Sequence, residues 1–391
     1  MSAVTLDLDT LLAESPEAAR ERAAGAFAAV SGGRPVVLHG AGGVGRSVLA
    51  ALRADGIEPV CFSDGGARPG AEPVDGVAVL PMAEAVARHG ADAVFVVTIL
   101  NPRFPYADVR GALTAAGAQT VCSWILVGWA HPAGLLPHYA VDLPHKVLEQ
   151  ADDVRAAYAL LADDASREQF LVQLAWRLTA DFDVLGGHLP TSEQYFSPDV
   201  ITLRDDDVFV DCGAYDGDTV ASLIEHHPAG VQKIYALEPD PDNLEALNAR
   251  LADLGPAVAG TVEVLPWAAG AERGTARWAL PGTSSAGMAE DGELEVEVAP
   301  LDELLHLGVA ATYIKMDIEG AEPDALAGAS ETIAKHRPAL AVCIYHVQDH
   351  LWQLPLLVSR MVEGEYRYAI RRYLSDCWEV VLYAVPADRA A

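Results

Sequence analysis

Short runs of β-branched and apolar residues alternate along this chain with longer segments in which apolar positions recur at helical spacing. Strands and helices that alternate in this way predict parallel sheets with crossover helices. The first 33 residues have a helical pattern rich in Ala and Glu. The strands predicted after them are 35–40, 57–64, 92–98 and a segment within 119–127.

The same alternation returns in the second half of the chain. Residues 146–185 are predicted to be mostly helical, because no Gly or Pro interrupts them, and residues 186–207 are predicted to form a loop. The parallel strands predicted next are 208–213, 233–239, 262–269, 311–319 and 338–346. Two antiparallel hairpins are also predicted, an inserted one from 275–280 with 294–305 and a final one from 366–373 with 378–385.

These patterns predict an α/β protein with two sheets. We expect a Rossmann-like N-terminal domain over residues 1–140, a helical lead-in and loop over 141–200, and a second α/β domain over 201–391. The chain has 391 residues, of which 51% are hydrophobic, so it is long enough for two cores.

Charge and cysteine content narrow the classes of partner. The net charge of −30 argues against nucleic acid and against anionic membranes, because both repel an acidic surface. The five cysteines are scattered and form no CxxC pair, which is typical of a reducing compartment. The first residues lack the pattern of a signal peptide, so we expect a cytoplasmic protein.

The sequence contains two glycine turns, each between a predicted strand and a predicted helix. The first, Gly40–Gly45, fits GxGxxG, and Asp64 follows about twenty residues later, as in a dinucleotide site. A bulky residue at Gly42 is expected to harm folding, because a tight turn has no room for Cβ. No Tyr-x-x-x-Lys pair accompanies this turn. Nucleotide or nucleotide-sugar binding, and a role in packing, dimerisation or shaping an acceptor cleft, are the alternatives.

The second glycine turn, Asp211–Gly217, is followed one strand later by Glu238. Gly213 and Gly217 allow close approach of the backbone to a ligand, and Asp211 can orient the turn or meet an amino group. A carboxylate at Glu238 can accept both hydroxyls of a ribose. This combination indicates adenosine binding without a pyrophosphate, as in S-adenosylmethionine (SAM).

Several motifs of residues 195–391 resemble the FkbM-type SAM-dependent methyltransferases. They are YFSPDVITLRDDDVFVDCGAYDGDT, IYALEPDPDN, VLPWAAG, YIKMDIEGAEPDAL, AVCIYHVQDHLWQLP and AIRRYLSDCWEVVLYAV. The resemblance implies a class I methyltransferase sheet of seven strands with a reversed last strand. It also implies methyl transfer to a hydroxyl of a sugar or natural product, and hence a small, glycosidic acceptor in natural-product or polysaccharide biosynthesis.

The resemblance also implies roles for individual residues. The methionine half of SAM would be held by Asp211, Gly213, Ala214 and Gly217. Glu238 would bind the ribose, and Trp267 and Ala268 would flank the adenine. Tyr195 precedes the sheet, where it either closes over SAM or packs the lead-in.

Methyl transfer to an alcohol benefits from a base or a metal ion. Lys315, Asp317 and Glu319 occupy alternate positions at one strand end, and His346 ends the next strand. These four residues are the predicted catalytic set. Asp317 and Glu319 are also candidate ligands of a divalent metal, while His346 favours the base. Glu322 is predicted to be a helix N-terminal acid.

Two other functions remain open on the sequence. One is a nucleotide- or NAD-linked enzyme that uses the first glycine turn, and the missing catalytic pair argues against it. The other is a non-catalytic binding protein that kept the fold, and the intact Glu238 and KMDIEGAE argue against that.

Overall fold

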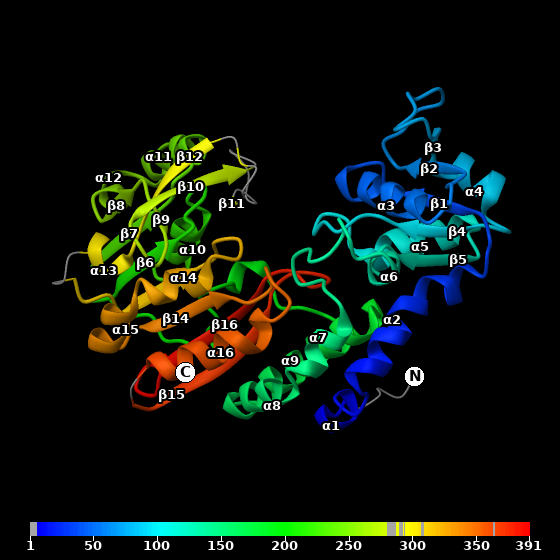
Figure 1. Cartoon of the computed structure of the whole chain (residues 1–391). Helices are drawn as coiled ribbons and strands as arrows, with labels where there is room; N and C mark the ends of the chain where they lie inside the picture. Colours follow the sequence, from blue (N-terminus) through cyan, green and yellow to red (C-terminus); the bar gives the residue numbers. More distant parts are fainter. Residues whose placement is uncertain (1–5, 280–286, 289–291, 293, 306–308, 363) are drawn as a thin grey trace.

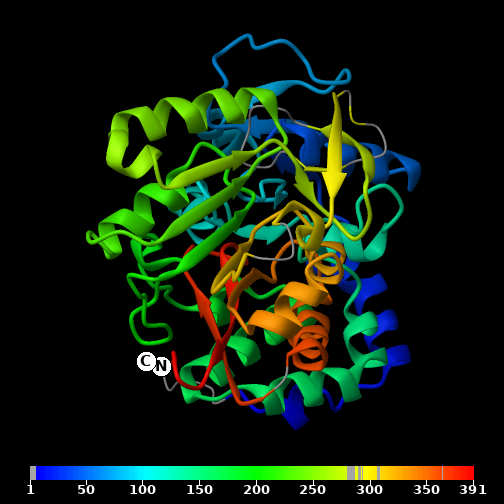
Figure 2. The same cartoon turned by 90° about the vertical axis from the view of Figure 1, so that its left-hand side faces the viewer.

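The computed structural model describes residues 6–279, 287–288, 292, 294–305, 309–362 and 364–391. It consists of two α/β lobes, with the N-terminal lobe on the right and the C-terminal lobe on the left of Figure 1. Turned by 90°, the molecule shows the C-terminal lobe in front of the N-terminal one (Figure 2). None of the helices within the described ranges combines the length and the apolar character needed to cross a membrane.

The N-terminal lobe contains a five-stranded parallel sheet of order β3-β2-β1-β4-β5. Its strands are β1 (Val36–His39), β2 (Cys61–Asp64), β3 (Val79–Pro81), β4 (Val94–Val97) and β5 (Thr120–Ser123). Helices α3 (Gly43–Ala54), α4 (Met82–His89) and α5 (Tyr106–Ala116) connect them. The four predicted strands are present, and the short edge strand β3 was not predicted.

The strand predicted within 119–127 is shorter than expected. It ends at Ser123, and the apolar residues that follow form helix α6 (Ile125–Ala130). Ile125, Val127 and Trp129 are buried there, and α6 packs on helix α2 (Pro16–Ser31). A fully buried helix and a fully buried strand present the same apolar run, so periodicity could not separate them.

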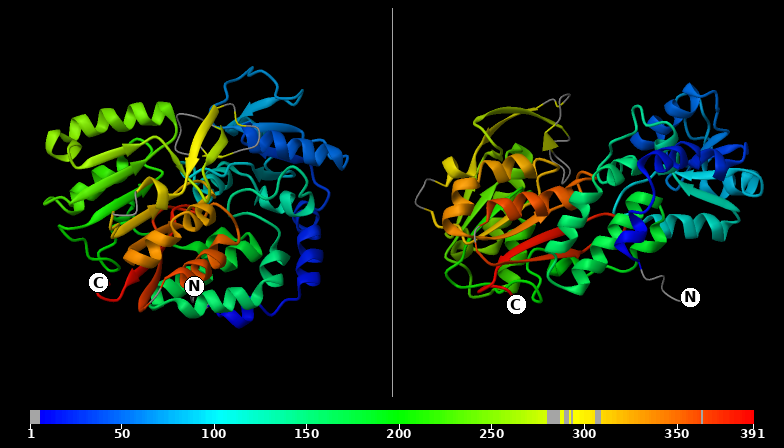
Figure 3. Two further views of the ribbon diagram at one scale, coloured as in Figure 1. Left: turned by 60° about the vertical axis from the view of Figure 1, so that its left-hand side comes forward. Right: turned by 60° about the horizontal axis from the view of Figure 1, so that its bottom comes forward.

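The helical lead-in joins the two lobes (Figure 3). It consists of α7 (Pro144–Glu149), α8 (Ala151–Leu160) and α9 (Asp164–Thr179). Helix α7 packs on α2, α8 packs on α16 (His350–Met361), and α9 packs on β15 of the C-terminal sheet. A new helix begins without Gly or Pro because the Asp163 side chain accepts the Ser166 N–H at 2.7 Å, which caps α9.

The C-terminal lobe has a seven-stranded sheet of order β15-β16-β14-β13-β6-β7-β8. Its strands are β6 (Val208–Cys212), β7 (Lys233–Leu237), β8 (Val262–Leu265), β13 (Tyr313–Met316), β14 (Ala339–Cys343), β15 (Tyr366–Arg372) and β16 (Val380–Pro386). Only β16 runs against its neighbours. The predicted class I sheet with a reversed last strand is confirmed.

The inserted hairpin forms a small second sheet beside the large one. Its long strands, β10 (Gly274–Ala279) and β12 (Leu294–Ala299), are antiparallel as predicted. The predicted strand 262–269 divides, because β8 stays in the large sheet and β9 (Ala268–Ala269) pairs with β12. Pro266 lies at the division, where it has no N–H to donate to a ladder. Position 280 of the predicted hairpin lies outside the described residues.

Candidate active site

A cavity of about 280 Å³ opens at the edge of the seven-stranded sheet where the parallel strands end. The turn after β6 contributes Gly213, and the end of β7 contributes Glu238. The end of β13 contributes Asp317, and the turn before β16 contributes Glu379. In an open α/β sheet this carboxyl edge is where ligands bind, and the topology therefore brings the glycine turn and an acidic cluster into one cavity.

The turn after β6 requires glycine at two positions. Gly213 and Gly217 both have φ of +85°, in the left-handed region. A Cβ atom on Gly213 would lie 2.0 Å from the carbonyl oxygen of Asp317, and one on Gly217 would lie 2.8 Å from Leu247 Cδ1. The turn can therefore approach the end of β13 only with glycine at position 213.

A buried ion pair between Lys315 and Asp211 stabilises this turn. Lys315 Nζ lies 2.9 Å from Asp211 Oδ1, and both side chains are almost fully buried. The same ammonium donates to the carbonyl oxygen of Gly213 at 2.6 Å. Burial raises the pKa of Asp211 to about 6, against the opposing charge of Lys315. Asp211 is thus placed to orient the turn through Lys315, which is one of the two roles considered for it.

Glu238, the predicted ribose-binding carboxylate, directly follows β7 and lines the cavity. Its oxygens accept the backbone N–H groups of Tyr215 and Asp240, each at 2.9 Å. Burial raises the pKa of Glu238 to about 7, although these hydrogen bonds favour the charged form. A carboxylate has further lone pairs, so the group can accept more hydrogen bonds from a ligand in the cavity.

The predicted cofactor residues divide into two groups. Gly213, Glu238, Trp267 and Ala268 line the cavity. Asp211, Ala214 and Gly217 are not among its lining residues and shape the turn instead. Sequence reasoning missed Asp218 and Thr219, which line the cavity from the first turn of α10 (Asp218–His226). Their position directly after a glycine turn was the available signal, because the first N–H groups of a helix attract ligands.

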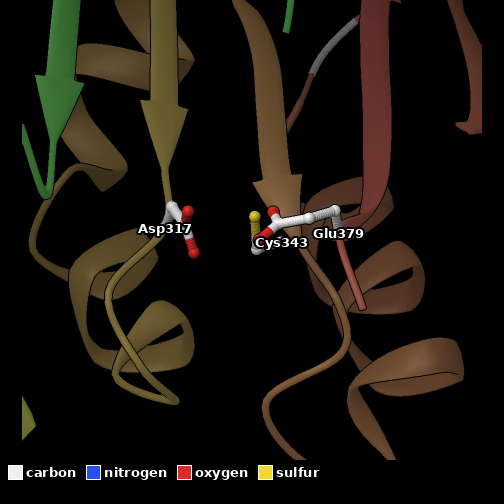
Figure 4. Close-up of side chains that lie close together, drawn as sticks. All are labelled: Asp317, Cys343 and Glu379. Carbon is white, nitrogen blue, oxygen red and sulfur yellow. The ribbon is translucent and has the colours of Figure 1, made fainter. Parts of the chain in front are cut away.

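An acidic cluster lies at the ends of β13 and β14 and the start of β16 (Figure 4). Asp317, Cys343 and Glu379 each place one candidate ligand atom within 4.8 Å of the others. Tyr195 Oη donates to Asp317 Oδ2 at 2.7 Å. The Tyr345 hydroxyl lies 3.3 Å from Asp317 Oδ1 and 3.4 Å from Glu379 Oε1, so it bridges the two carboxylates.

The carboxylates of the cluster differ in proton affinity. Burial opposes ionisation of Asp317, but its hydrogen bond with His346 and the charge of Lys315 hold its pKa well below the usual range. Burial and the negative charge of Asp317 raise the pKa of Glu379 to about 7. Burial likewise raises the pKa of Glu319 to about 7. Together with Glu238, three carboxyl groups that line this cavity therefore have pKa values raised to about 7.

His346 joins the predicted cluster but is not among the residues that line the cavity. Its side chain is 1% exposed, with Nδ1 2.8 Å from Glu322 Oε1 and Nε2 3.3 Å from Asp317 Oδ1. Burial opposes its charge, yet Glu322 and Asp317 raise the pKa of His346 well above the usual value. Both ring nitrogens face carboxylates and the residue lies outside the cavity lining, so the base role of His346 stays a prediction.

Glu322 is a helix N-terminal acid, as predicted, and it also has a second set of contacts. It does lie in the first turn of α14 (Glu322–Ala327), but it is completely buried and holds His346. His350 Nδ1 lies 3.4 Å from its other oxygen. Glu322 and His346 together form a buried pair, and His346 Nε2 of this pair contacts Asp317.

The donor set of the cluster does not suit Mg²⁺ or another hard divalent cation. Burial raises the pKa of Cys343 well above its usual value, so this position offers a neutral thiol. Asp317, one of the two metal ligands predicted from the sequence, already accepts a hydrogen bond from Tyr195 and lies 3.3 Å from His346 Nε2. Magnesium prefers several free oxygen ligands. Glu319, the second candidate, is not part of the group of ligand atoms that lie together.

The first glycine turn is closed by contacts within the N-terminal lobe. The two oxygens of Asp64 accept the N–H groups of Ala41 and Gly66, at 3.1 and 2.8 Å. A Cβ atom on Gly45 would lie 2.1 Å from the Gly40 carbonyl oxygen. Gly42 has φ of −77° and its Cβ would meet no atom within 4 Å, so the expected crowding at Gly42 is wrong and belongs to Gly45.

Comparisons with known proteins agree with the C-terminal fold. Residues 211–377 match the family model of the methyltransferase FkbM domain. The structure is similar to a crystal structure of methyltransferase FkbM from Methylobacillus flagellatus KT, at 23% identity and a TM-score of 0.75, over 96% of this chain and 97% of that chain. A precorrin-6y C5,15-methyltransferase from Geobacter metallireducens GS-15 matches 48% of this chain and 84% of its own, at 15% identity and a TM-score of 0.30. No curated protein matches the sequence.

Proposed function

Since residues 211–377 form a methyltransferase FkbM domain, we propose that this enzyme uses SAM to methylate a hydroxyl group of a sugar or sugar-bearing natural product. The observation that carries the proposal is the single cavity shared by the glycine turn, Glu238 and the acidic cluster. When bound, SAM supplies a methyl group on a positively charged sulfur, which an oxygen nucleophile accepts.

The residues present suit that cofactor. Glu238 would accept the ribose hydroxyls, the Gly213 turn would face the methionine half, and Trp267 would lie against the adenine. Trp267 is half-buried and Arg273 lies over its outer part, with Cζ 4.7 Å from the ring centroid. A stacked aromatic ring held in this way is preorganised for a flat base.

Glu379 is the proton acceptor in this proposal. A hydroxyl that attacks a methyl group has to lose its proton, and a base with a pKa near the working pH does this best. Glu379 meets that condition, with a pKa of about 7. Glu319 has a similar pKa but interacts with the cationic His346, whose Nε2 lies 3.8 Å away. Asp317, held ionised, keeps Tyr345 oriented toward Glu379.

Calorimetric titration with SAM tests the cofactor assignment. Glu238→Ala should weaken SAM binding by at least tenfold, because each hydrogen bond to a charged group contributes about 1.5–3 kcal/mol. Glu238→Gln keeps one oxygen that can accept a backbone N–H of the turn. It therefore checks that weaker SAM binding does not result from misfolding. Glu263→Ala on β8 is the matched control, since that carboxylate pairs with Lys233 on the outside of the sheet. Equal SAM affinity in all four proteins would refute the assignment.

The same titration with NADH tests the alternative of an NAD-linked enzyme. Any heat of binding should come without oxidation of NADH, because no Tyr-x-x-x-Lys pair accompanies the first turn. Oxidation of NADH in step with product formation would overturn the methyltransferase proposal in favour of that alternative.

A further inference from the structure

The cavity is lined from both lobes, and the N-terminal contribution has no role in the function proposed above. Leu100, Asn101 and Pro102 line it from the segment directly after β4. Tyr139 lines it from the segment before α7. The carboxyl edge of the N-terminal sheet therefore faces the same cavity as the carboxyl edge of the C-terminal sheet.

Tyr139 contacts the catalytic side of the cavity. Its ring packs edge-on against Trp378, with centroids 5.0 Å apart and an interplanar angle of 66°. Its hydroxyl interacts with the Glu319 carboxylate and lowers the pKa of that group, against the larger effect of burial. Trp378 directly precedes Glu379, so Tyr139 contacts the part of the cavity next to the proposed proton acceptor.

The backbone holds Tyr139 in a specific conformation. Its φ is +48°, a region that costs a residue with a side chain free energy. His138 pairs with Val141 through backbone hydrogen bonds, and its ring packs edge-on against the buried Trp124 at 5.4 Å. The tyrosine is thus carried by a short rigid loop.

The turn that precedes Glu379 also contacts the N-terminal lobe. The turn between β15 and β16 extends toward the N-terminal lobe (Figure 1). There the Tyr106 N–H, at the start of α5, donates to Asp376 Oδ2 at 3.0 Å in a buried contact. The position of Glu379 relative to Tyr139 is therefore set by contacts between the lobes.

We propose that the N-terminal domain forms one wall of the acceptor site, with Tyr139 and the segment 100–102 contacting the molecule whose hydroxyl faces Glu379. The inference rests on the proposed function. Around this end lie the rings of Tyr139, Tyr345 and Trp378 and the carboxylates of Glu319 and Glu379. Rings accept the apolar face of a sugar, and carboxylates accept its hydroxyl protons. The wall selects the acceptor, while the C-terminal lobe binds the cofactor.

Saturation-transfer difference NMR tests this without knowledge of the natural acceptor. The probes are S-adenosylhomocysteine (SAH) and a panel of methyl glycosides of glucose, galactose, mannose, rhamnose and xylose, added to the full-length protein. We expect signals from SAH and from at least one glycoside. Tyr139→Ala should weaken glycoside binding at least tenfold and leave SAH binding unchanged.

Further variants separate recognition from folding. Tyr139→Phe keeps the ring and loses the phenol oxygen, which can accept a hydrogen bond from a glycoside hydroxyl, so glycoside affinity should fall about threefold to tenfold. Asn101→Ala changes an exposed side chain of the same wall and should also reduce glycoside affinity. Tyr158→Ala on α8, a half-buried tyrosine outside the cavity lining, is the control and should bind like the parent protein.

The outcomes distinguish the two proposals. Absence of SAH signals from the parent protein would refute the proposed function itself. SAH signals without any glycoside signal would overturn the sugar-binding wall alone. Glycoside binding that is equal in the parent, Tyr139→Phe and Asn101→Ala would show that the N-terminal domain takes no part in recognition.

Discussion

The two glycine turns share one local design and differ in their surroundings. Each turn follows a parallel strand and precedes a helix. In each lobe an acid at the end of the next strand accepts a backbone N–H from the glycine turn. This acid is Asp64 in the N-terminal lobe and Glu238 in the C-terminal lobe. Beside the first turn, strand β4 ends in Thr98, whose hydroxyl donates to the Gly40 carbonyl at 2.7 Å. Beside the second, β13 ends in Asp317, which faces a cavity with Glu379.

This difference shows that a glycine turn alone does not identify a nucleotide site. In both lobes the glycines permit close packing of a strand, a turn and a helix. Chemistry depends on what the neighbouring strands carry at their ends. Beside the first turn a threonine satisfies the Gly40 carbonyl, whereas beside the second turn carboxylates with raised pKa values line a cavity.

The largest expected effect on turnover comes from replacing Asp317, the acid beside the second turn. Asp317→Asn should lower kcat by about 10²–10⁴-fold, the range of acid–base contributions, because Tyr345 and Glu379 lose their charged neighbour. Release of SAH with the best-binding methyl glycoside measures it. Thr98→Val at the equivalent strand end should leave kcat within about twofold. Similar losses in both variants would remove the distinction between the two turns.

Stability should also depend more on the second turn than on the first. Lys315→Met leaves Asp211 buried without its ion pair and should cost about 3–5 kcal/mol of unfolding free energy. Asp64→Ala removes an acceptor from two backbone N–H groups beside solvent and should cost about 1 kcal/mol. Urea denaturation followed by circular dichroism measures both. A smaller loss for Lys315→Met than for Asp64→Ala would contradict this ranking.

The pH dependence of turnover sharpens the role of Glu379. Its pKa is raised to about 7, so the acid form dominates below pH 7 and cannot accept a proton. The rate should therefore rise with pH and level off above about 7, falling about tenfold per unit well below it. Glu379→Gln should lose this ionisation as well as most of the rate, while Glu319→Gln should retain the rise. A profile unchanged by Glu379→Gln would assign the base elsewhere.

The smallest effects are expected within the first turn itself. Gly42→Ala should change stability by less than about 0.5 kcal/mol, because its φ of −77° suits alanine and no atom lies within 4 Å. Gly45→Ala should destabilise the protein clearly, since its Cβ would overlap the Gly40 carbonyl. Thermal unfolding compares the two. Destabilisation by Gly42→Ala would mean that the turn is tighter than the structure shows.

Much of the fold could be predicted because apolar runs bounded by glycine and proline carry a strong signal. The seven strands of the second sheet and its reversed last strand followed from the family resemblance, and the final hairpin followed from the short connection 374–377. The helix at Ile125–Ala130 could not be separated from a strand by pattern. The split between β8 and β9 depends on pairing with the distant β12, which local sequence does not encode.

The site was predicted less completely than the fold. Residues adjacent in the motifs, such as Asp317 and Glu319, were found because they end a strand. Glu379 was missed because β16 is reversed, so the residue before that strand, and not after it, reaches the ligand edge. The environment of His346 could not be predicted either. Its Nδ1 contacts Glu322, a residue of helix α14, and this contact depends on tertiary packing.

The turn that carries Glu379 also affects how this protein can be divided. The segment shared with the FkbM family model ends at residue 377, two positions before Glu379, and begins after Tyr195, whose phenol contacts Asp317. A chain cut at those limits would keep the glycine turn and lose Tyr195 and Glu379, which both line the cavity. The smallest unit for expression or for exchange between relatives is therefore larger than the segment recognised by similarity. It includes the helices and the lobe that hold the turn in place.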